Sequence, residues 1–253
     1  MIQKYSLIDA ESDMVIGIGS DLTGLMGNCT VEIAEEAFHK ITLLDFQFRD
    51  DFKQYCQTTK AYINNIYVTI LNYEGCSIGS YYFYLREPIF FHKTGFGKGL
   101  IELELIGTLL QVASKESLEI WEMRRSPLIE RNLWTQLSTA QRSGWLEVAR
   151  LYNNKNTSSS TQDQQNGEYE IDAGSITDSS SFFCALGEAI NGPGGYYGFD
   201  LKSLEDCLCG GFGAIPPYVL HLHNANSMLD EGNAFFQQLK EVFLSRNVKL
   251  VYH

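Results

Sequence analysis

The sequence lacks any long apolar run. Of its 253 residues 44% are hydrophobic, yet no apolar run reaches the roughly 18 residues that a membrane helix needs. The first residues, MIQKYSLIDAESD, lack the apolar core of a signal peptide. Both absences favour a cytoplasmic protein that does not bind a membrane.

Basic residues are also scarce, at 19 Lys and Arg against 31 Asp and Glu, which gives a net charge of −12. This balance argues against nucleic-acid binding, because phosphate contacts need Lys and Arg. Residues 168–253 alone hold eleven acidic and four basic residues, a net charge of −7. Such a concentrated negative field would attract a basic partner and speed their encounter, although it is also explained by solubility.

Motifs for metal or cofactor binding are missing too. The six cysteines form no C-x-x-C pair and no zinc spacing, which favours free thiols. His221 and His223 would lie on one face of a strand, but no third ligand is evident, so two half-exposed histidines are favoured over a metal site. We therefore expect no metal and no cofactor.

No nucleophile, base and orienting residue occur at a spacing typical of a catalytic site. The sequence thus favours a protein that is not an enzyme. One alternative stays open, an enzyme with its site in the N-terminal domain around Glu102 and Glu104 and the nearby aromatic residues.

A polar segment divides the chain. Residues 153–167, NNKNTSSSTQDQQNG, hold no large apolar side chain that would offset the entropy of ordering them, which predicts a flexible linker. Residues 1–152 then form an α+β domain, mostly β with helices at its end. The expected strands are 4–8, 14–18, 40–49, 62–73, 77–85 and 99–106, and the expected helical segments are 32–39, 114–123, a helix from Pro127 and 144–151.

Residues 168–253 form the second predicted domain, a small α/β unit. Strands are expected at 168–171, 218–223 and 248–252, and helices at 180–190 and 233–245. A single helix joins the last two strands, which favours parallel pairing in a three-stranded sheet.

The second domain is organised around residues 194–211, GGYYGFDLKSLEDCLCGG. Asp200 is a good N-cap, and Leu201, Leu204 and Leu208 recur at helical spacing. The outward side of this helix carries Lys202, Glu205 and Asp206. A short acidic helix between glycines suits binding to a basic surface better than it suits catalysis.

This stretch resembles the barstar family, intracellular inhibitors of the ribonuclease barnase. The resemblance rests on residues 196–198 (YYG), Leu201, Leu204, residues 206–208 (DCL) and Gly210, and it continues through residues 217–220 and the last helix and strand. It covers residues 168–253 and implies a small α/β fold with a three-stranded parallel sheet.

The resemblance also implies a site. Tyr196, Asp206 and Gly210 match positions that face the enzyme in the family, where carboxylates replace the substrate phosphate. With Glu205 they form the expected toxin-binding surface. Phe212 and Gln237 lie on its rim, and Lys202 pairs with an acid on the toxin.

Two of these residues depart from the family. Lys202 stands where the family has an aspartate, and Glu205 stands where it has a tryptophan. Gln237 falls near a glutamate that contributes to binding in the family. These departures indicate a toxin other than barnase.

The sequence therefore predicts an immunity or inhibitor protein that blocks the active site of a cognate toxin, a basic ribonuclease or other nuclease. One alternative is an interaction adaptor in which the N-terminal domain binds the main partner. The role of that domain and the oligomeric state are left open by the sequence.

Overall fold

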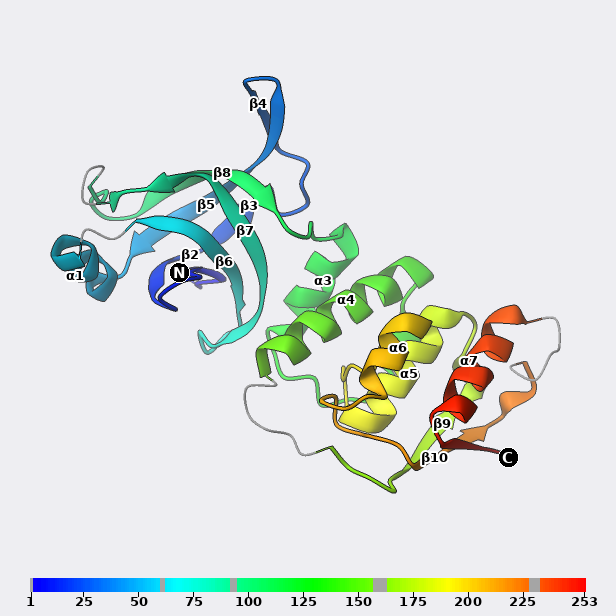
Figure 1. Ribbon diagram of the computed structural model, residues 1–253. Helices are drawn as coiled ribbons and strands as arrows, with labels where there is room; N and C mark the ends of the chain where they lie inside the picture. Colours follow the sequence, from blue (N-terminus) through cyan, green and yellow to red (C-terminus); the bar gives the residue numbers. More distant parts are fainter. Residues whose placement is uncertain (1, 60–61, 92–94, 157–162, 228–232) are drawn as a thin grey trace. The chain divides into compact units, whose positions relative to one another are not determined.

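The computed structural model describes residues 2–59, 62–91, 95–156, 163–227 and 233–253 (Figure 1). Its internal contacts divide the chain into two units, Met1–Ser126 and Pro127–His253. None of the helices in the described ranges combines the length and the apolar composition needed to span a bilayer.

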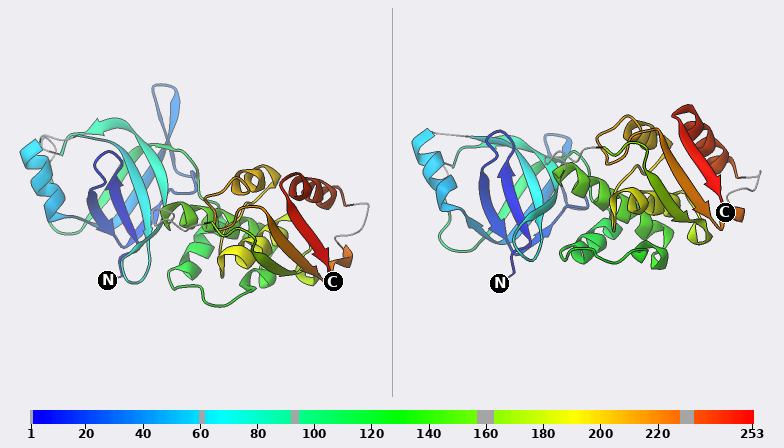
Figure 2. Two further views of the ribbon diagram at one scale, coloured as in Figure 1. Left: turned by 60° about the horizontal axis from the view of Figure 1, so that its bottom comes forward. Right: turned by 90° about the horizontal axis from the view of Figure 1, so that it is seen from below.

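Antiparallel strands of the first unit close into a ring. The strand order is β2-β1-β6-β7-β8-β5, and β2 also pairs with β5. Figure 2 shows these strands curving into a barrel, which confirms the mostly β character predicted for this region. The ring strands are β1 (Tyr5–Asp9), β2 (Val15–Gly19), β5 (Glu36–Phe48), β6 (Ile63–Leu71), β7 (Ser77–Ile89) and β8 (Ile101–Leu109).

The hairpin between β6 and β7 illustrates how the sequence builds the barrel. Ile66, Val68 and Ile70 alternate along β6 and are buried, as period-two patterning requires. The turn that joins the strands is closed by Asn72, whose Oδ1 accepts from the N–H groups of Glu74 at 3.0 Å and Cys76 at 2.7 Å. Asn72 thus closes the turn that contains Glu74 and Gly75.

Two helices cover parts of the barrel. Helix α3 (Lys115–Arg124) begins at Ser114, whose side chain accepts from the N–H of Ser117, and it confirms the helix expected at 114–123. Its Trp121 lies against Gly79, where there is no Cβ to displace it, and donates from Nε1 to the Tyr81 hydroxyl at 3.1 Å. Helix α1 (Asp50–Thr59) was not expected from the sequence, because only Phe52 and Cys56 of its side chains are buried and its apolar pattern is weak.

Two of the helical predictions are wrong. Residues 32–39 form the end of β4 (Thr30–Ile33) and the start of β5, joined by a tight turn in which Ala34 and Glu35 have positive φ. Short strand β3 (Asp21–Thr23) and β4 both pair with β5 outside the ring. The helix expected from Pro127 is reduced to one 3-10 turn, η1 (Leu133–Gln136).

The second unit contains the predicted three-stranded parallel sheet. Its order is β11-β10-β9, with β9 (Glu168–Asp172) at one edge. The central strand is β10 (Tyr218–His223), and the other edge is β11 (Val248–Tyr252). The remaining short turns are η2 (Ala173–Ser175) and η3 (Ala225–Ser227).

Helices cover one face of this sheet. Helix α5 (Ser179–Asn191) and helix α7 (Ala234–Ser245) meet through aromatic rings, among them Phe182 and Phe243 with centroids 6.3 Å apart. Leu220 and Leu222 of β10 are buried beneath them. Residues that alternate with this buried set stay partly or fully exposed on the other face.

The division between the units lies before the predicted linker. A helix was expected at residues 144–151, and helix α4 (Thr139–Asn156) includes them. It contacts α5 and is part of the second unit, Pro127–His253. Of the linker predicted at 153–167, residues 157–162 lie outside the described residues. Its described end is ordered by backbone pairing, since Gln164 donates to the Gly213 carbonyl at 3.0 Å and Asn166 to that of Pro217 at 2.8 Å.

Candidate functional site

A short capped helix forms the centre of the candidate site. Helix α6 (Leu201–Cys207) begins at Asp200, whose carboxylate accepts from the N–H of Ser203 at 2.7 Å, while the Ser203 hydroxyl accepts from the N–H of Asp200 at 2.9 Å. This reciprocal capping box fixes the start of the helix. Leu204 and Cys207 are buried, which leaves the opposite side of the helix exposed.

The exposed side of α6 carries both signs of charge. Lys202, Glu205 and Asp206 are all exposed, as the sequence predicted. Glu205 and Asp206 lie one turn after Lys202, so the helix presents a cation near its start and two carboxylates near its end. Neither carboxylate forms an ion pair with a described residue.

Tyr196 does not lie on this surface. Its side chain is buried at 4% exposure, and its ring lies beside that of Phe212 with centroids 5.9 Å apart. Burial raises the pKa of Tyr196 to about 12. The exposed aromatic residue next to α6 is instead Phe199, at 45%, which sequence analysis did not select.

The loops on either side of α6 are tied together by Asn191 at the end of α5. Its Nδ2 donates to the Tyr196 carbonyl at 2.7 Å and to the Phe212 carbonyl at 2.9 Å. One side chain therefore fixes the loop that enters α6 and the loop that leaves it. Phe212 itself is half-buried.

The carboxylate of Asp163 also holds the loop that follows α6. It accepts from the N–H groups of Gly211 at 2.7 Å and Gly213 at 2.9 Å. Gly210 has a φ of 109°, and a Cβ there would meet Asp163 Oδ2 at 2.9 Å. Gly210 is thus required by the loop geometry, whatever else it contacts.

Arg246, directly after α7, lies near the end of α6. Arg246 Nη1 lies 3.8 Å from the sulfur of Cys209, just after α6. Gln237 is exposed on the first turn of α7, roughly 13 Å along the helix axis from Arg246. The structure therefore does not bring Gln237 beside the C-terminal end of α6.

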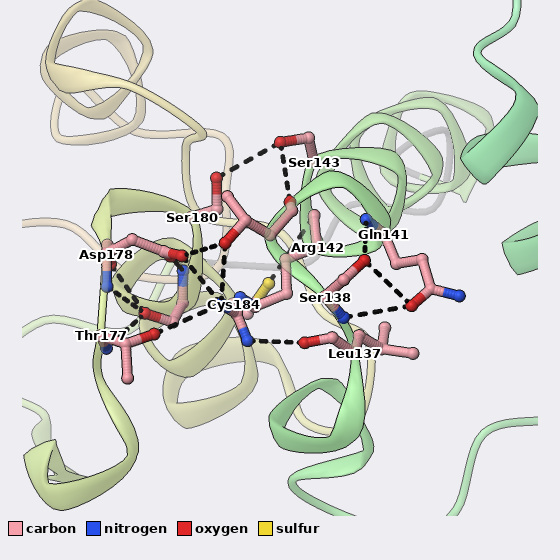
Figure 3. A network of polar contacts seen from close by, with 11 residues as sticks. Leu137, Ser138, Gln141, Arg142, Ser143, Thr177, Asp178, Ser180 and Cys184 are labelled. Atoms are coloured by element: carbon pink, nitrogen blue, oxygen red, sulfur yellow. Dashed lines mark hydrogen bonds and ion pairs between the residues drawn. The ribbon is translucent and has the colours of Figure 1, made fainter.

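A polar network joins α4 to the start of α5 (Figure 3). Arg142 Nη2 donates to Asp178 Oδ2 at 2.8 Å, and Arg142 Nη1 donates to the Leu137 carbonyl at 2.7 Å. Burial alone would raise the pKa of Asp178. The hydrogen bonds from the Ser181 N–H and from Arg142 outweigh it and hold that pKa at about 2.

Three histidines gather on the exposed face of the sheet. His221 Nδ1 and His253 Nε2 lie 2.9 Å apart, and the ring of His223 stacks on that of His253. His253 is thus a third imidazole that the sequence did not place. No group of three or more His, Cys, Asp or Glu in the described ranges is arranged to hold a metal ion.

The residues of the alternative enzyme site lie on the first unit. Glu102 and Glu104 are both exposed on β8, and Glu104 pairs with Lys40 at 2.9 Å. This pairing is a surface ion pair between neighbouring strands.

Comparison with known families finds a match within the second unit. Residues 167–249 match the family described as Barstar (barnase inhibitor), so the C-terminal region is a barstar domain. The match begins one residue before the sequence-based expectation and covers about a third of the chain. No curated protein and no solved structure matches the chain.

Proposed function

We propose that the barstar domain binds a cognate nuclease toxin, a ribonuclease in the first instance, and blocks its active site. The observation that carries the proposal is the pair of exposed carboxylates, Glu205 and Asp206, on a helix fixed by its capping box. The family that residues 167–249 match is described as a barnase inhibitor.

The chemistry of such a blockade is electrostatic. A ribonuclease cleft binds phosphate with cationic side chains, and a carboxylate placed there makes charge-assisted hydrogen bonds to the same groups. Because both carboxylates are on a short rigid element, little conformational entropy is lost when they bind. The net charge of −7 over residues 168–253 would draw a basic toxin toward this surface.

Lys202 sets the kind of toxin that fits. A lysine directed at a purely cationic cleft is repelled, so the proposed partner carries an acidic side chain opposite Lys202. Within this proposal barnase itself is a poor target. Phe199 replaces Tyr196 as the proposed aromatic contact, because Tyr196 is buried.

The test is a binding titration of the full chain against any nuclease encoded by the neighbouring reading frame. Asp206→Ala should weaken binding by ~1.5–3 kcal/mol, the net value of a hydrogen bond to a charged group. Thermal stability should hardly change, because Asp206 is exposed. Glu241→Ala, an equal loss of charge at an exposed position on α7, is the matched control.

Unchanged affinity in Asp206→Ala, or an equal loss in both variants, would refute the proposed contact. Separate expression of residues 1–126 and 127–253 distinguishes this function from that of an adaptor. If residues 1–126 alone bound the toxin and residues 127–253 did not, the barrel would be the binding unit.

A further inference from the structure

The three-stranded sheet of the second unit ends on one side in β9, whose outer edge pairs with no described strand. The N–H of Val219 donates to the Gly167 carbonyl at 3.0 Å, and Val219 is the register partner of Glu168. In a parallel pair this pattern turns the backbone groups of Glu168 away from β10, and those of Glu170 follow two residues later. Their N–H and C=O groups have no backbone partner among the described residues and could pair with a further strand.

The side chains along this edge form an acidic row. Tyr169 and Ile171 are buried, on the side of the sheet that α5 contacts. The alternate residues, which face the open side of the sheet, are Glu168, Glu170 and Asp172.

Glu170, in the middle of the acidic row, is the carboxylate most open to a partner. Glu168 lies 3.7 Å from His221 Nε2, and Asp172 accepts from the Gly174 N–H at 3.0 Å. Glu170 is exposed and forms no ion pair or side-chain hydrogen bond in the described ranges. A cation that reached Glu170 would therefore displace no described partner.

A cavity of about 500 Å³ adjoins the second half of β9. Its lining includes both Ile171, which faces the helices, and Glu170, which faces the open side. The cavity therefore lies at the edge of the strand, where the two faces meet. Ala185 and Ala189 of α5 also line it, and their short side chains leave room beside the edge.

The far wall of the cavity comes from outside the residues that match the barstar family. It includes Arg131, Asn132 and the buried Trp134. Glu188 of α5, only 4% exposed, holds this wall, because its carboxylate accepts from the Asn132 N–H at 3.0 Å and from Trp134 Nε1 at 2.8 Å. Arg131 is the one Lys or Arg in a lining that holds three carboxylates, so the net charge of the lining is negative.

We propose that the free edge of β9 binds an extended basic segment of another protein, which adds to the sheet as a fourth strand. Main-chain hydrogen bonds to Glu168 and Glu170 supply affinity, and alternate side chains supply specificity. Lysine or arginine side chains on one face pair with the acidic row, while small apolar side chains on the other face enter the cavity beside Ala185 and Ala189. The acidic row disfavours a second copy of β9, because like charges on paired strands repel. The proposal uses no residue of α6 and is independent of the toxin surface.

The probe is the peptide acetyl-Lys-Val-Lys-Val-Lys-amide, titrated into the full-length, ¹⁵N-labelled protein. The amide resonances of Glu168 and Glu170 should shift in a saturable manner, because their N–H groups enter new hydrogen bonds. We expect a dissociation constant of about 1 mM. The amide resonance of Lys249 on β11, at the other edge of the sheet, should hardly move.

Two N-methylated forms of the peptide separate strand pairing from simple charge attraction. In an antiparallel addition the lysine N–H groups face β9, and in a parallel addition the valine N–H groups do. Methylation of the lysine amides or of the valine amides keeps the charge of the peptide. One of the two forms should nevertheless bind at least about tenfold more weakly, because its hydrogen bonds to the edge are lost.

A charge-matched pair of variants tests the acidic row. Glu170→Gln should weaken peptide binding about threefold, the value of one charged cross-strand pair. Glu241→Gln, an equal loss of charge at an exposed position on α7, should leave binding unaltered. Both positions are exposed, so both variants should fold.

Four results would overturn the proposal. One is no saturable shift of Glu170 up to about 10 mM peptide. Another is equal affinity of the parent peptide and both methylated forms, which would mean charge attraction alone. The third is an equal loss of affinity in Glu170→Gln and Glu241→Gln. The last is a shift of Glu170 with protein concentration in the absence of peptide, which would make a second copy of the chain the occupant.

Discussion

The two units of this protein are specified in different ways. The barrel depends on pairings between distant strands, such as that of β2 with β5, which closes the ring. The barstar-containing unit repeats a local device, because α5 and α6 both begin with an Asp-x-x-Ser capping box, at Asp178 with Ser181 and at Asp200 with Ser203. Local sequence signals therefore define the second unit, while the register of its strands and the closure of the barrel define the first.

The largest expected effect tests the barrel. Gly107 pairs with β5 and β7, and a Cβ there would overlap the Tyr84 carbonyl oxygen. Gly107→Ala should destabilise this unit by about 3 kcal/mol, the upper part of the range for overpacking. Thermal unfolding followed by the Trp121 indole resonance measures it.

In the same samples Trp134 and Trp145 report on the second unit, and their unfolding should be unchanged. The neighbouring exposed position, Thr108→Ala, is the control and should shift stability by less than about 0.5 kcal/mol. If all three tryptophan resonances were lost together in Gly107→Ala, the two units would not be independent.

The next effect lies in the network between α4 and α5. The folded pKa of Asp178 is about 2, below its unfolded value near 4, so the carboxylate stabilises the unit above about pH 4. That stability is lost as the pH falls from about 4 to about 2, and it amounts to ~2 kcal/mol.

Asp178→Asn should therefore lower the free energy of unfolding at pH 7 and flatten its dependence on pH below about 4. Urea unfolding at a series of pH values measures both. A variant that kept the full acid sensitivity would show that other carboxylates are responsible.

A smaller loss is expected from the cap of α6. Asp200→Ala removes the bond to the Ser203 N–H and should cost about 1 kcal/mol. Faster amide hydrogen exchange at Ser203 would confirm it. Lys202→Ala, on the exposed side of the same helix, should leave that exchange rate unaltered.

The smallest effect returns to the barrel unit. Lys53 and Asp50 form an exposed ion pair on α1 at 2.7 Å, with the Asp50 side chain 95% exposed. Lys53→Gln should leave stability nearly unchanged, since solvent and salt screen such pairs. If Lys53→Gln lowered stability as much as Asp178→Asn does, the two units would not differ in how much they depend on such local polar pairs.

Sequence reasoning reached furthest where the determinants are local. The cap at Asp200 and the leucine spacing gave helix α6 with Glu205 and Asp206 exposed, and the structure agrees. The family resemblance implied that Tyr196 lies on the surface, but the structure buries it. Its burial depends on Asn191 and Phe212, which meet it only when the loops fold together.

Other features could not be read from the sequence because they join remote positions. Asp163 lies in a segment predicted to be a linker, yet it binds the N–H groups of Gly211 and Gly213. Nothing local in a run of polar residues indicates such a partner. The sequence predicts helix at residues 32–39 for a similar reason. The pairing of β4 with β5 across the turn at Ala34 and Glu35 makes this segment a hairpin instead.

The buried carboxylate of Glu188 has a practical consequence for anyone who trims this protein. A fragment cut at residues 167–249 would contain Glu188 but lose both of its donors, Asn132 and Trp134. A desolvated negative charge would then stand without compensation inside the piece. If that fragment failed to neutralise a toxin, the cause would be the choice of its first residue and not the binding surface. Fragments that start at Pro127 keep both donors of Glu188 and avoid this ambiguity.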